Sequence, residues 1–436
     1  MELKELEAAS FVELRFVHVN AYTGVSKNET VTFEKVDGGE SFIISSGATK
    51  IKRGPKKARR EEYPLDEWNY QLARYIKKGF DPVATKKAKI VEINIGNGFK
   101  PLSDKEFQSF IEEMVQANNE MIQSSYSVKK LEDIPQEHID HAQEALIDLS
   151  TRKDSISVSE FNDILMKDIW TYVPRAMANA RKLLAAKPDQ FEEIIEREQE
   201  RIDNLLQLLR VKAVDNTTDI LTANGLKGRK VTDEEEKYLK ELMTDRSNQY
   251  LRAWRVSNEE TEKAFDEYCK EQGFTEENGI NHLFHGTGFE NVWSIYKNGL
   301  YLNPAVIKSN VRICGKAFGY GLYFAPYCYK SMGYASIRGA RWNNGGSSNS
   351  NNAGYLLVFK VATGKPYYIY SDPNGCNRPN HWEDFHKDHP DMHCCWAERG
   401  KQGSNGLNRL VMDEVIVYQQ KQATIEYIIE FDGNRY

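Results

Sequence analysis

The sequence predicts a multidomain α+β protein, because three successive stretches follow three different patterns. Residues 1–100 alternate apolar and polar side chains in short runs before one amphipathic helix, which predicts a small β-sheet with a packed helix. Residues 101–250 repeat apolar side chains at helical spacing, which predicts an all-α helical bundle. Residues 251–436 combine helical stretches with long apolar strands, which predicts a mixed α+β domain.

Composition excludes several classes of protein. The 436 residues carry a formal net charge of −6, although residues 1–100 are basic, with 18 Lys or Arg against 14 Asp or Glu. All six cysteines lie from Cys269 onward without a C-x-x-C pair, which is typical of free thiols in a reducing compartment. Since no apolar run reaches transmembrane length and the N-terminus lacks a signal-peptide pattern, we expect a soluble intracellular protein without a membrane partner.

The first stretch has the pattern of a β-meander. Strands are expected at residues 11–19, 30–36 and 41–45, and Gly38-Gly39 separates the last two as a hairpin turn would. A helix is expected from Asp66, and its apolar face consists of Trp68, Leu72, Tyr75 and Ile76.

A basic segment without an acidic residue lies between the third strand and this helix. Its positive side chains are Lys52, Arg53, Lys56, Lys57, Arg59 and Arg60. Such a cluster can neutralise nucleic-acid phosphates whatever the base sequence, so these are the candidate DNA-binding residues. The same pattern is also typical of a solvated loop or of a nuclear-import signal, and the residues alone leave all three interpretations open.

Helix-start signals divide residues 101–250. Ser103 with Glu106, and Thr232 with Glu235, have the spacing of capping boxes. Further helices are expected to begin near Pro135, Ser157 and Asp189. Their apolar stripes predict a packed core rather than contacts with a cofactor.

Four short motifs within residues 251–436 concentrate chemically useful side chains. In chain order they are Phe284-His285-Gly286-Thr287, Gly319-Tyr320-Gly321-Leu322-Tyr323-Phe324-Ala325, Lys330-Ser331-Met332-Gly333-Tyr334 and Asp413-Glu414-Val415-Ile416-Val417-Tyr418. Taken singly, a glycine-rich turn before a strand or a buried histidine has a structural explanation. Glu414 is harder to explain in that way, because a charged side chain that opens an apolar strand needs a reason.

Together the four motifs resemble the catalytic domain of the poly(ADP-ribose) polymerases. That family carries a His-Tyr-Glu triad, and the matching catalytic residues here are His285, Tyr323 and Glu414. The resemblance implies an ADP-ribosyltransferase fold with a split β-sheet, NAD as the substrate, release of nicotinamide, and no required metal. Glu414 is then expected to stabilise an oxocarbenium-like centre and to polarise the attacking hydroxyl. His285, with Thr287 beside it, matches the residue that bonds the adenosine ribose.

The same resemblance assigns the groups that hold nicotinamide. The backbone of Gly286 and the hydroxyl of Ser331 match the groups that bind the carboxamide. Tyr323 and Tyr334 match two aromatic side chains that sandwich the nicotinamide ring.

The preceding residues resemble the upstream domains of DNA-damage-dependent members of that family. The sheet, basic segment and helix are similar to a tryptophan-glycine-arginine (WGR) domain, although Ser46-Gly47-Ala48 keeps only the glycine of the signature. Residues 101–250 are similar to the helical regulatory domain, for example in Trp170-Thr171-Tyr172-Val173-Pro174 and Asp203-Asn204-Leu205-Leu206. This order implies activation by DNA strand breaks and protein acceptors that include the enzyme itself. It implies the nucleus as location in a eukaryote, and the cytoplasm otherwise.

Two alternative functions stay open. The first is a mono-ADP-ribosyltransferase acting on protein or on nucleic-acid ends, although mono-transferases of this superfamily often replace the Glu that Glu414 retains. The second is a catalytically weak DNA-binding scaffold, against which the intact triad argues. The His- and Cys-rich segment 376–396 has no spacing typical of a zinc site, so we expect no metal.

Overall fold

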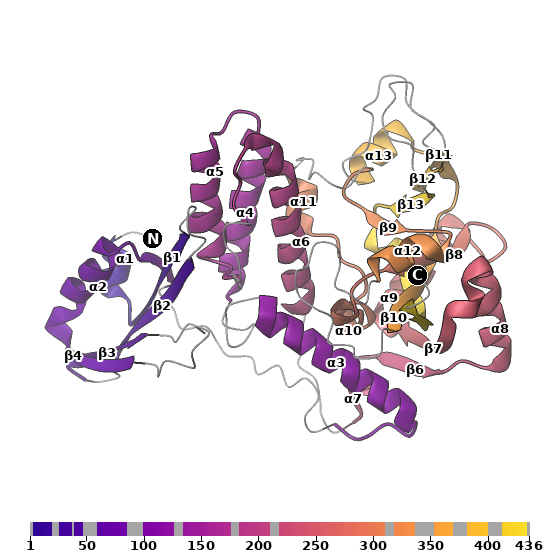
Figure 1. Cartoon of the computed structure of the whole chain (residues 1–436), viewed down its shortest axis with the longest axis horizontal. Helices are drawn as coiled ribbons and strands as arrows, with labels where there is room; N and C mark the ends of the chain where they lie inside the picture. The colour runs from indigo at the N-terminus through magenta and orange to yellow at the C-terminus, as the bar shows by residue number, and fades with distance from the viewer. Residues whose placement is uncertain are drawn as a thin grey trace. The chain divides into compact units, whose positions relative to one another are not determined.

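The computed structural model divides the chain into two compact units (Figure 1). Unit 1 contains Met1–Ile93 and Ile122–Ile202, and unit 2 contains Asn94–Met121 and Asp203–Tyr436. This division differs from the three consecutive domains predicted at 1–100, 101–250 and 251–436. The structure describes residues 3–19, 26–36, 39–46, 59–84, 99–125, 134–175, 183–209, 218–309, 318–335, 353–368, 382–399 and 412–433.

Unit 1 begins with an antiparallel five-stranded sheet in the order β4-β3-β2-β1-β5. Its elements are α1 (Leu3–Ala8), β1 (Phe11–Val19), β2 (Ser26–Lys35), β3 (Ser41–Ser46), β4 (Arg59–Pro64), α2 (Trp68–Lys77) and β5 (Asp81–Ala84). Phe33 and Phe42 on the sheet meet Trp68 of α2 edge to face, with ring centroids 6.0 and 5.1 Å away. The three predicted strands and the helix are confirmed.

The rest of unit 1 is helical. It contains α4 (Gln136–Arg152), α5 (Val158–Ile164), a π-helical turn η3 (Leu165–Trp170), a 3-10 turn η5 (Pro188–Gln190) and α6 (Phe191–Leu209), which runs on into unit 2. Ser157 caps α5 as expected, because its hydroxyl accepts from the N–H of Glu160 at 3.2 Å.

A buried arginine joins the sheet of unit 1 to these helices. Arg15 of β1 is 2% exposed, and its Nη1 donates to the carbonyls of Thr171 and Tyr172, each at 2.9 Å. Its Nε donates to Glu13 at 2.6 Å. His138 of α4 makes a second connection, since its Nε2 lies 2.6 Å from the carbonyl oxygen of Val83 in β5. The sheet and the helices therefore share one buried polar network.

A second buried network centres on Glu198 of α6. This carboxylate is completely buried and faces the guanidinium groups of Arg175, Arg197 and Arg201. The indole N–H of Trp170 also donates to it, at 3.2 Å. Burial alone would raise the pKa of Glu198, but the three guanidinium groups outweigh burial and hold that pKa below its ordinary value.

Unit 2 is built on two sheets. A five-stranded antiparallel sheet has the order β6-β7-β14-β10-β8, and a four-stranded sheet has the order β11-β12-β13-β9. Its strands are β6 (Leu226–Lys230), β7 (Tyr250–Asn258), β8 (Ile280–Gly286), β9 (Leu322–Phe324), β10 (Ala353–Ala362), β11 (Pro366–Tyr368), β12 (Cys394–Ala397), β13 (Glu414–Val417) and β14 (Ala423–Asp432). The long apolar strands expected within residues 251–436 are present, with β10 and β14 as the longest of them.

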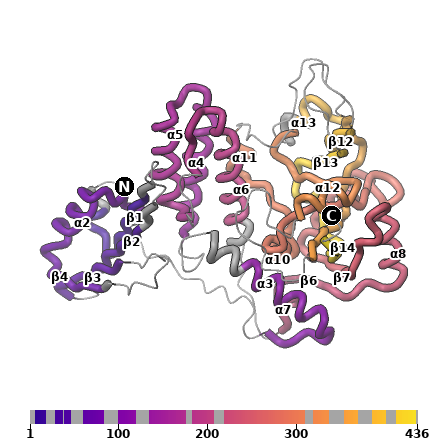
Figure 2. Tube along the Cα trace, in the orientation of Figure 1, coloured from indigo at the N-terminus to yellow at the C-terminus, as the bar shows by residue number. Residues whose placement is uncertain are grey.

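The helices of unit 2 pack on both faces of the larger sheet and, in the case of α13, against the smaller sheet. They are α3 (Lys105–Ser125), α7 (Ile220–Ala223), α8 (Asp233–Leu242), η6 (Thr244–Gln249), α9 (Glu259–Gln272), α10 (Phe289–Asn298), α11 (Pro304–Lys308), α12 (Cys328–Tyr334), α13 (Trp382–Asp388) and η7 (Gln420–Gln422). One apolar core joins α3 and α10 to the sheet, and a second joins α8 and α12 to its other face. Figure 2 shows β14, in yellow, beside β7, although the two strands are far apart in the sequence.

Helix α3 belongs to unit 2, although it lies in the stretch predicted as a helical bundle. Its apolar face packs into the core of unit 2, where the ring of Phe110 stacks on Trp254 of β7 at 3.8 Å. The capping box predicted for Ser103 and Glu106 is wrong, because Asp104 provides the cap by accepting from the N–H of Phe107 at 3.0 Å. The second predicted box is confirmed, since Thr232 and Glu235 bond each other's backbone N–H groups.

None of the helices in the described part of the chain combines the length and the apolar character that crossing a membrane requires.

Candidate active site

The predicted site lies where the two sheets of unit 2 meet. Phe284 of β8 and Ala325, just after β9, exchange two backbone hydrogen bonds of 2.8 Å each and so connect the sheets. His285 follows Phe284, and its Nδ1 lies 3.0 Å from the carbonyl oxygen of Tyr323 in β9. Because a carbonyl oxygen only accepts, Nδ1 carries the proton in this bond. The imidazole orientation is thereby fixed by the strand that carries the predicted tyrosine.

Tyr323 is anchored by its hydroxyl to the glycine-rich turn that precedes β9. The N–H of Phe318 donates to this hydroxyl at 3.0 Å, and the hydroxyl donates to the carbonyl of Gly319 at 2.8 Å. Gly319 has a φ of +88°, a backbone conformation that residues other than glycine rarely adopt. The turn and the aromatic ring therefore form one fixed unit.

Helix α12 lies directly against the end of β8. A Cβ on Gly286 would come within 1.9 Å of the carbonyl oxygen of Ser331, so only glycine fits there. Ser331 is buried, whereas Tyr334 at the end of α12 is 55% exposed. A half-exposed aromatic side chain is suited to stacking on a ligand. Thr287 follows Gly286, and its hydroxyl accepts from Asn291 at 3.1 Å.

Glu414 is the first residue of β13. Strand β13 pairs with β9 so that Ile416 lies opposite Tyr323, and with β12 on its other side. The Glu414 side chain is 15% exposed and forms an ion pair with Lys330 of α12, which is equally exposed. The ammonium group of Lys330 pairs with one carboxylate oxygen of Glu414, and the Glu414 side chain is partly rather than completely buried.

Sequence reasoning did not assign Lys330 a role. The signal was available, because Lys330 directly precedes Ser331 in the third motif. Only the fold, however, brings this residue beside Glu414, 84 positions later in the chain.

The structure thus gathers the residues of all four motifs on neighbouring elements. They are His285, Gly286 and Thr287 at the end of β8, Tyr323 in β9, Ser331 and Tyr334 in α12, and Glu414 in β13. Their catalytic and NAD-binding roles stay predictions.

The candidate DNA-binding residues belong to unit 1. Lys52, Arg53, Lys56 and Lys57 lie outside the described residues, as does Gly47 of the predicted signature. Arg59 and Arg60 begin β4, and the side chain of Arg60 is exposed.

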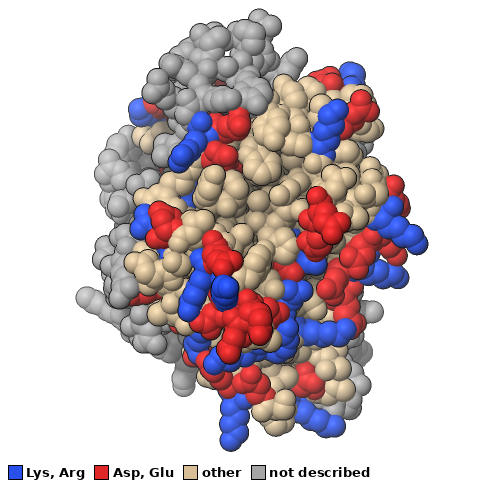
Figure 3. All heavy atoms as spheres, turned by 90° about the vertical axis from the view of Figure 1, so that its right-hand side faces the viewer, with Lys and Arg blue, Asp and Glu red and all other residues tan. Residues whose placement is uncertain are grey.

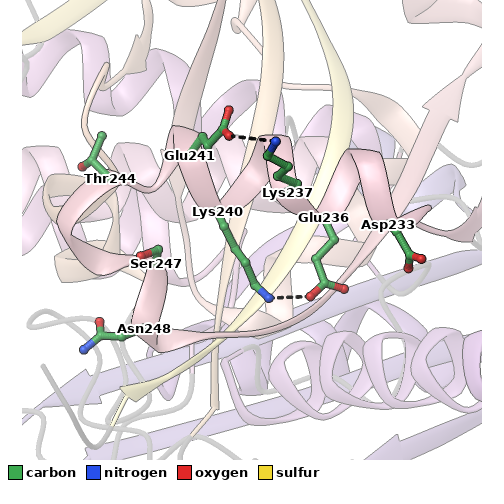
Figure 4. A pocket seen from close by; sticks show the side chains of 8 residues that line it. All are labelled: Asp233, Glu236, Lys237, Lys240, Glu241, Thr244, Ser247 and Asn248. Atoms are coloured by element: carbon green, nitrogen blue, oxygen red, sulfur yellow. Dashed lines mark hydrogen bonds and ion pairs between the residues drawn. The ribbon is translucent and has the colours of Figure 1, made fainter.

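A shallow hollow of about 800 Å³ lies elsewhere, over α8 and η6 (Figure 4). Its lining residues are Asp233, Glu236, Lys237, Lys240, Glu241, Thr244, Ser247 and Asn248. Lys240 pairs with Glu236, and Lys237 with Glu241, so the charges are already matched within the helix. On the face that Figure 3 shows, acidic and basic side chains likewise intermingle. Without an aromatic lining residue, this hollow does not suit a flat nicotinamide ring.

No three His, Cys, Asp or Glu side chains converge as metal ligands within the described ranges. Cys376 and His381 of the His- and Cys-rich segment lie outside those ranges, and the absence of a metal stays a prediction.

Comparison with known proteins shows which family a large part of unit 2 resembles. Residues 233–433 match the family model of the poly(ADP-ribose) polymerase catalytic domain. This stretch of unit 2 therefore resembles a poly(ADP-ribose) polymerase catalytic domain. The mixed α+β architecture with antiparallel sheets is consistent with that family. The domain therefore indicates ADP-ribosyltransferase activity with NAD as substrate.

Three relatives each match less than half of the chain. A protein named uncharacterized protein 101L of Invertebrate iridescent virus 6 is 27% identical over 182 residues, which cover 42% of this chain and 73% of the viral protein. Protein mono-ADP-ribosyltransferase PARP3 of Gallus gallus is 26% identical over 200 residues, or 41% of this chain and 33% of that protein. The poly(ADP-ribose) polymerase-like protein 100L of the same virus is 26% identical over 184 residues, or 42% of this chain and 86% of its own length.

Proposed function

We propose that the protein is a poly(ADP-ribose) polymerase that DNA strand breaks activate, with protein acceptors that include itself. The observation that carries this proposal is the position of Glu414 within the stretch that matches the poly(ADP-ribose) polymerase catalytic domain, paired with Lys330 and one strand away from Tyr323. A polymerase needs a carboxylate that reaches an incoming hydroxyl, and a partly exposed strand end offers one.

The reaction breaks the bond between nicotinamide and the ribose C1′ and forms a bond from C1′ to the acceptor oxygen. The bonding electron pair leaves with nicotinamide, which departs as a neutral molecule, and positive charge develops on the ribose. In the proposed mechanism Glu414 stabilises that charge and, as general base, takes the proton of the attacking hydroxyl as the bond from C1′ to oxygen forms. Gly286, Ser331, Tyr323 and Tyr334 hold the nicotinamide, and His285 with Thr287 holds the adenosine ribose.

DNA contact is proposed for the basic segment from Lys52 to Arg60. Support comes from its acid-free sequence and from the exposed Arg60 side chain. Within unit 1 the buried Arg15 bonds the sheet to the helices, so a displacement of the sheet on DNA binding would be transmitted to the helices. DNA would then favour one state of the helices through its different affinity for the two states. In a eukaryote this activity belongs in the nucleus.

A mono-ADP-ribosyltransferase is the second candidate, because one relative is named as a protein mono-ADP-ribosyltransferase. Retention of the triad glutamate at Glu414 favours the polymerase.

One incubation separates these candidates. The full chain is incubated with labelled NAD, with and without nicked DNA, and the products are run on a gel. Polymer that appears or increases with DNA supports the proposal, a single-unit product supports the mono-transferase, and no product from the wild-type chain contradicts both.

The DNA part of the proposal is tested by neutralising the basic segment. Replacing Lys52, Arg53, Lys56, Lys57, Arg59 and Arg60 by Gln is expected to weaken DNA binding. The slope of log affinity against log salt should shrink by about one for each phosphate that the variant no longer neutralises. Basal NAD turnover without DNA should not change. Unchanged DNA affinity at several salt concentrations would contradict a role for this segment in DNA binding.

A further inference from the structure

Hydroxyl groups of three tyrosines hold the turn at residues 318–321. Tyr323 bonds the N–H of Phe318 and the carbonyl of Gly319. Tyr418 donates to the carbonyl of Phe318 at 2.6 Å. The hydroxyl of Tyr320, which belongs to the turn itself, donates to Asp203 of α6 at 2.9 Å. Both backbone groups of Phe318 are therefore bonded to tyrosine hydroxyls, one from β9 and one from the residue that follows β13.

Tyr418 cannot move without disturbing this arrangement. It is 2% exposed, and its ring stacks on Phe385 with centroids 5.2 Å apart. The Sγ of Cys395 lies 3.2 Å from its hydroxyl. Burial, followed by the neighbouring Cys395, raises the pKa of Tyr418, so the hydroxyl keeps its proton and donates it to the carbonyl of Phe318.

The turn has little room to settle elsewhere. A Cβ on Gly321 would lie 2.6 Å from Ile416 and 2.8 Å from the carbonyl oxygen of Val417, which shows that the turn rests on β13. A shift of Phe318 is therefore passed on to the hydroxyl of Tyr323 rather than absorbed locally.

We propose that Tyr418 is a positioning residue for nicotinamide binding. Its hydroxyl fixes Phe318, Phe318 fixes the hydroxyl of Tyr323, and the Tyr323 ring keeps the orientation that stacking requires. This inference rests on the proposed function, in which Tyr323 stacks on nicotinamide. Nothing in the four-motif pattern assigns this role to Tyr418, which ends the motif of the catalytic glutamate.

The test uses the full-length chain and two buried tyrosines of the same kind. Tyr418→Phe removes only the hydroxyl. Tyr296→Phe is the matched control, because the Tyr296 hydroxyl also donates to a backbone carbonyl, that of Lys227 at 2.7 Å, in a fully buried position away from the turn. Nicotinamide affinity is measured by calorimetry without turnover, alongside KM and kcat for NAD and the thermal midpoint.

We expect Tyr418→Phe to weaken nicotinamide binding about 5-fold, the effect of about one net hydrogen bond, and to raise KM for NAD similarly with less change in kcat. Tyr296→Phe should lower the thermal midpoint by a comparable amount and leave nicotinamide affinity unchanged. Equal nicotinamide affinity in wild type and Tyr418→Phe overturns the inference, as does an equal loss of affinity in both variants.

Two further outcomes are decisive. If Tyr418→Phe does not fold, Tyr323→Phe loosens the same turn while keeping the stacking ring, and undiminished nicotinamide affinity in that variant overturns the inference. A wild-type chain that binds no nicotinamide would instead overturn the proposed function, together with the inference that depends on it.

Discussion

Two glutamates, one in each unit, show how differently this chain treats a carboxylate. Glu198 in unit 1 is fully buried among three guanidinium groups and an indole N–H. Glu414 in unit 2 keeps 15% of its side chain exposed and has an ion pair with one flexible lysine, Lys330. In the first arrangement the carboxylate is surrounded by charged and hydrogen-bonding partners. The second arrangement orients a carboxylate and leaves part of it exposed to solvent.

The difference extends to other polar groups of the two units. In unit 1, Arg15 and His138 are buried and bond backbone carbonyls, so they connect elements rather than meet a ligand. In unit 2, the predicted site residues lie at strand ends and at the end of a short helix. We therefore expect substitutions of the buried, fully bonded groups of unit 1 to change folding stability. Substitutions of the predicted site residues of unit 2 are expected to change activity.

The largest expected effect is on activity. Glu414→Gln should lower NAD turnover by about 10²–10⁴-fold, because a positioned general base is lost. The free energy of unfolding should stay within about 1 kcal/mol of wild type, since the pair with Lys330 is partly solvated. Product gels and urea unfolding measure the two quantities. Normal polymer synthesis by this variant would contradict the role given to Glu414.

The opposite result is expected for Glu198→Ala. Removing one partner of a buried ion cluster leaves guanidinium groups uncompensated and should cost about 3–5 kcal/mol of folding free energy. Glu193→Ala, an exposed acid on the same helix, is the control and should cost less than about 1 kcal/mol. Urea unfolding distinguishes the two variants, and similar midpoints would show that the buried carboxylate stabilises unit 1 no more than an exposed one.

Acid should weaken unit 1 through His138. Burial, and then the nearby Arg15 charge, lower the pKa of His138 from 6.5 to about 4. The unfolded chain therefore binds a proton near pH 6.5, whereas the folded chain does so only near pH 4. This contribution to stability is complete above pH 6.5 and is lost as pH falls towards 4, by about 3 kcal/mol in total. His138→Gln should flatten the fall in unfolding free energy between about pH 7 and 4, and an unchanged slope would contradict this role of His138.

The smallest effect on stability is expected at Lys330. Lys330→Met should cost less folding free energy than Glu198→Ala, because both side chains of its pair keep 15% of their surface exposed, whereas Glu198 is completely buried. A cost as large as that of Glu198→Ala would show that the pair with Glu414 supports the fold instead of the site. Thermal unfolding of the variant beside wild type measures it.

The sequence predicted the site better than the packing around it. The resemblance of the four motifs grouped His285, Tyr323 and Glu414 before the fold was known, and the structure places these residues on β8, β9 and β13. Their catalytic roles stay predictions. The pairing of Glu414 with Lys330 depends on how α12 is placed beside β13, which periodicity does not encode.

An amphipathic pattern likewise does not show which element a helix packs against. The apolar face of α3 would suit a helical bundle as well as the core of unit 2, and only the stacking of Phe110 on Trp254 distinguishes the two. Arg15 is an equally difficult case, since an arginine in an alternating strand is expected to face water. Its burial follows from two carbonyls, those of Thr171 and Tyr172, which lie 156 and 157 positions away in the chain.

The hydrogen bond from Tyr320 to Asp203 has a consequence for the exchange of backbone amide protons. Asp203 also accepts from Asn303 at 3.3 Å. A movement of this part of α6 therefore disturbs the hydrogen bond to the turn at 318–321, and a movement of the turn disturbs α6. Coupling of this kind is reciprocal. A ligand that orders the turn should therefore slow deuterium uptake in the last turns of α6, and fraying of α6 should reduce the affinity for that ligand by the same factor. Isotope labelling of α6 would then report events at the turn without any reaction taking place.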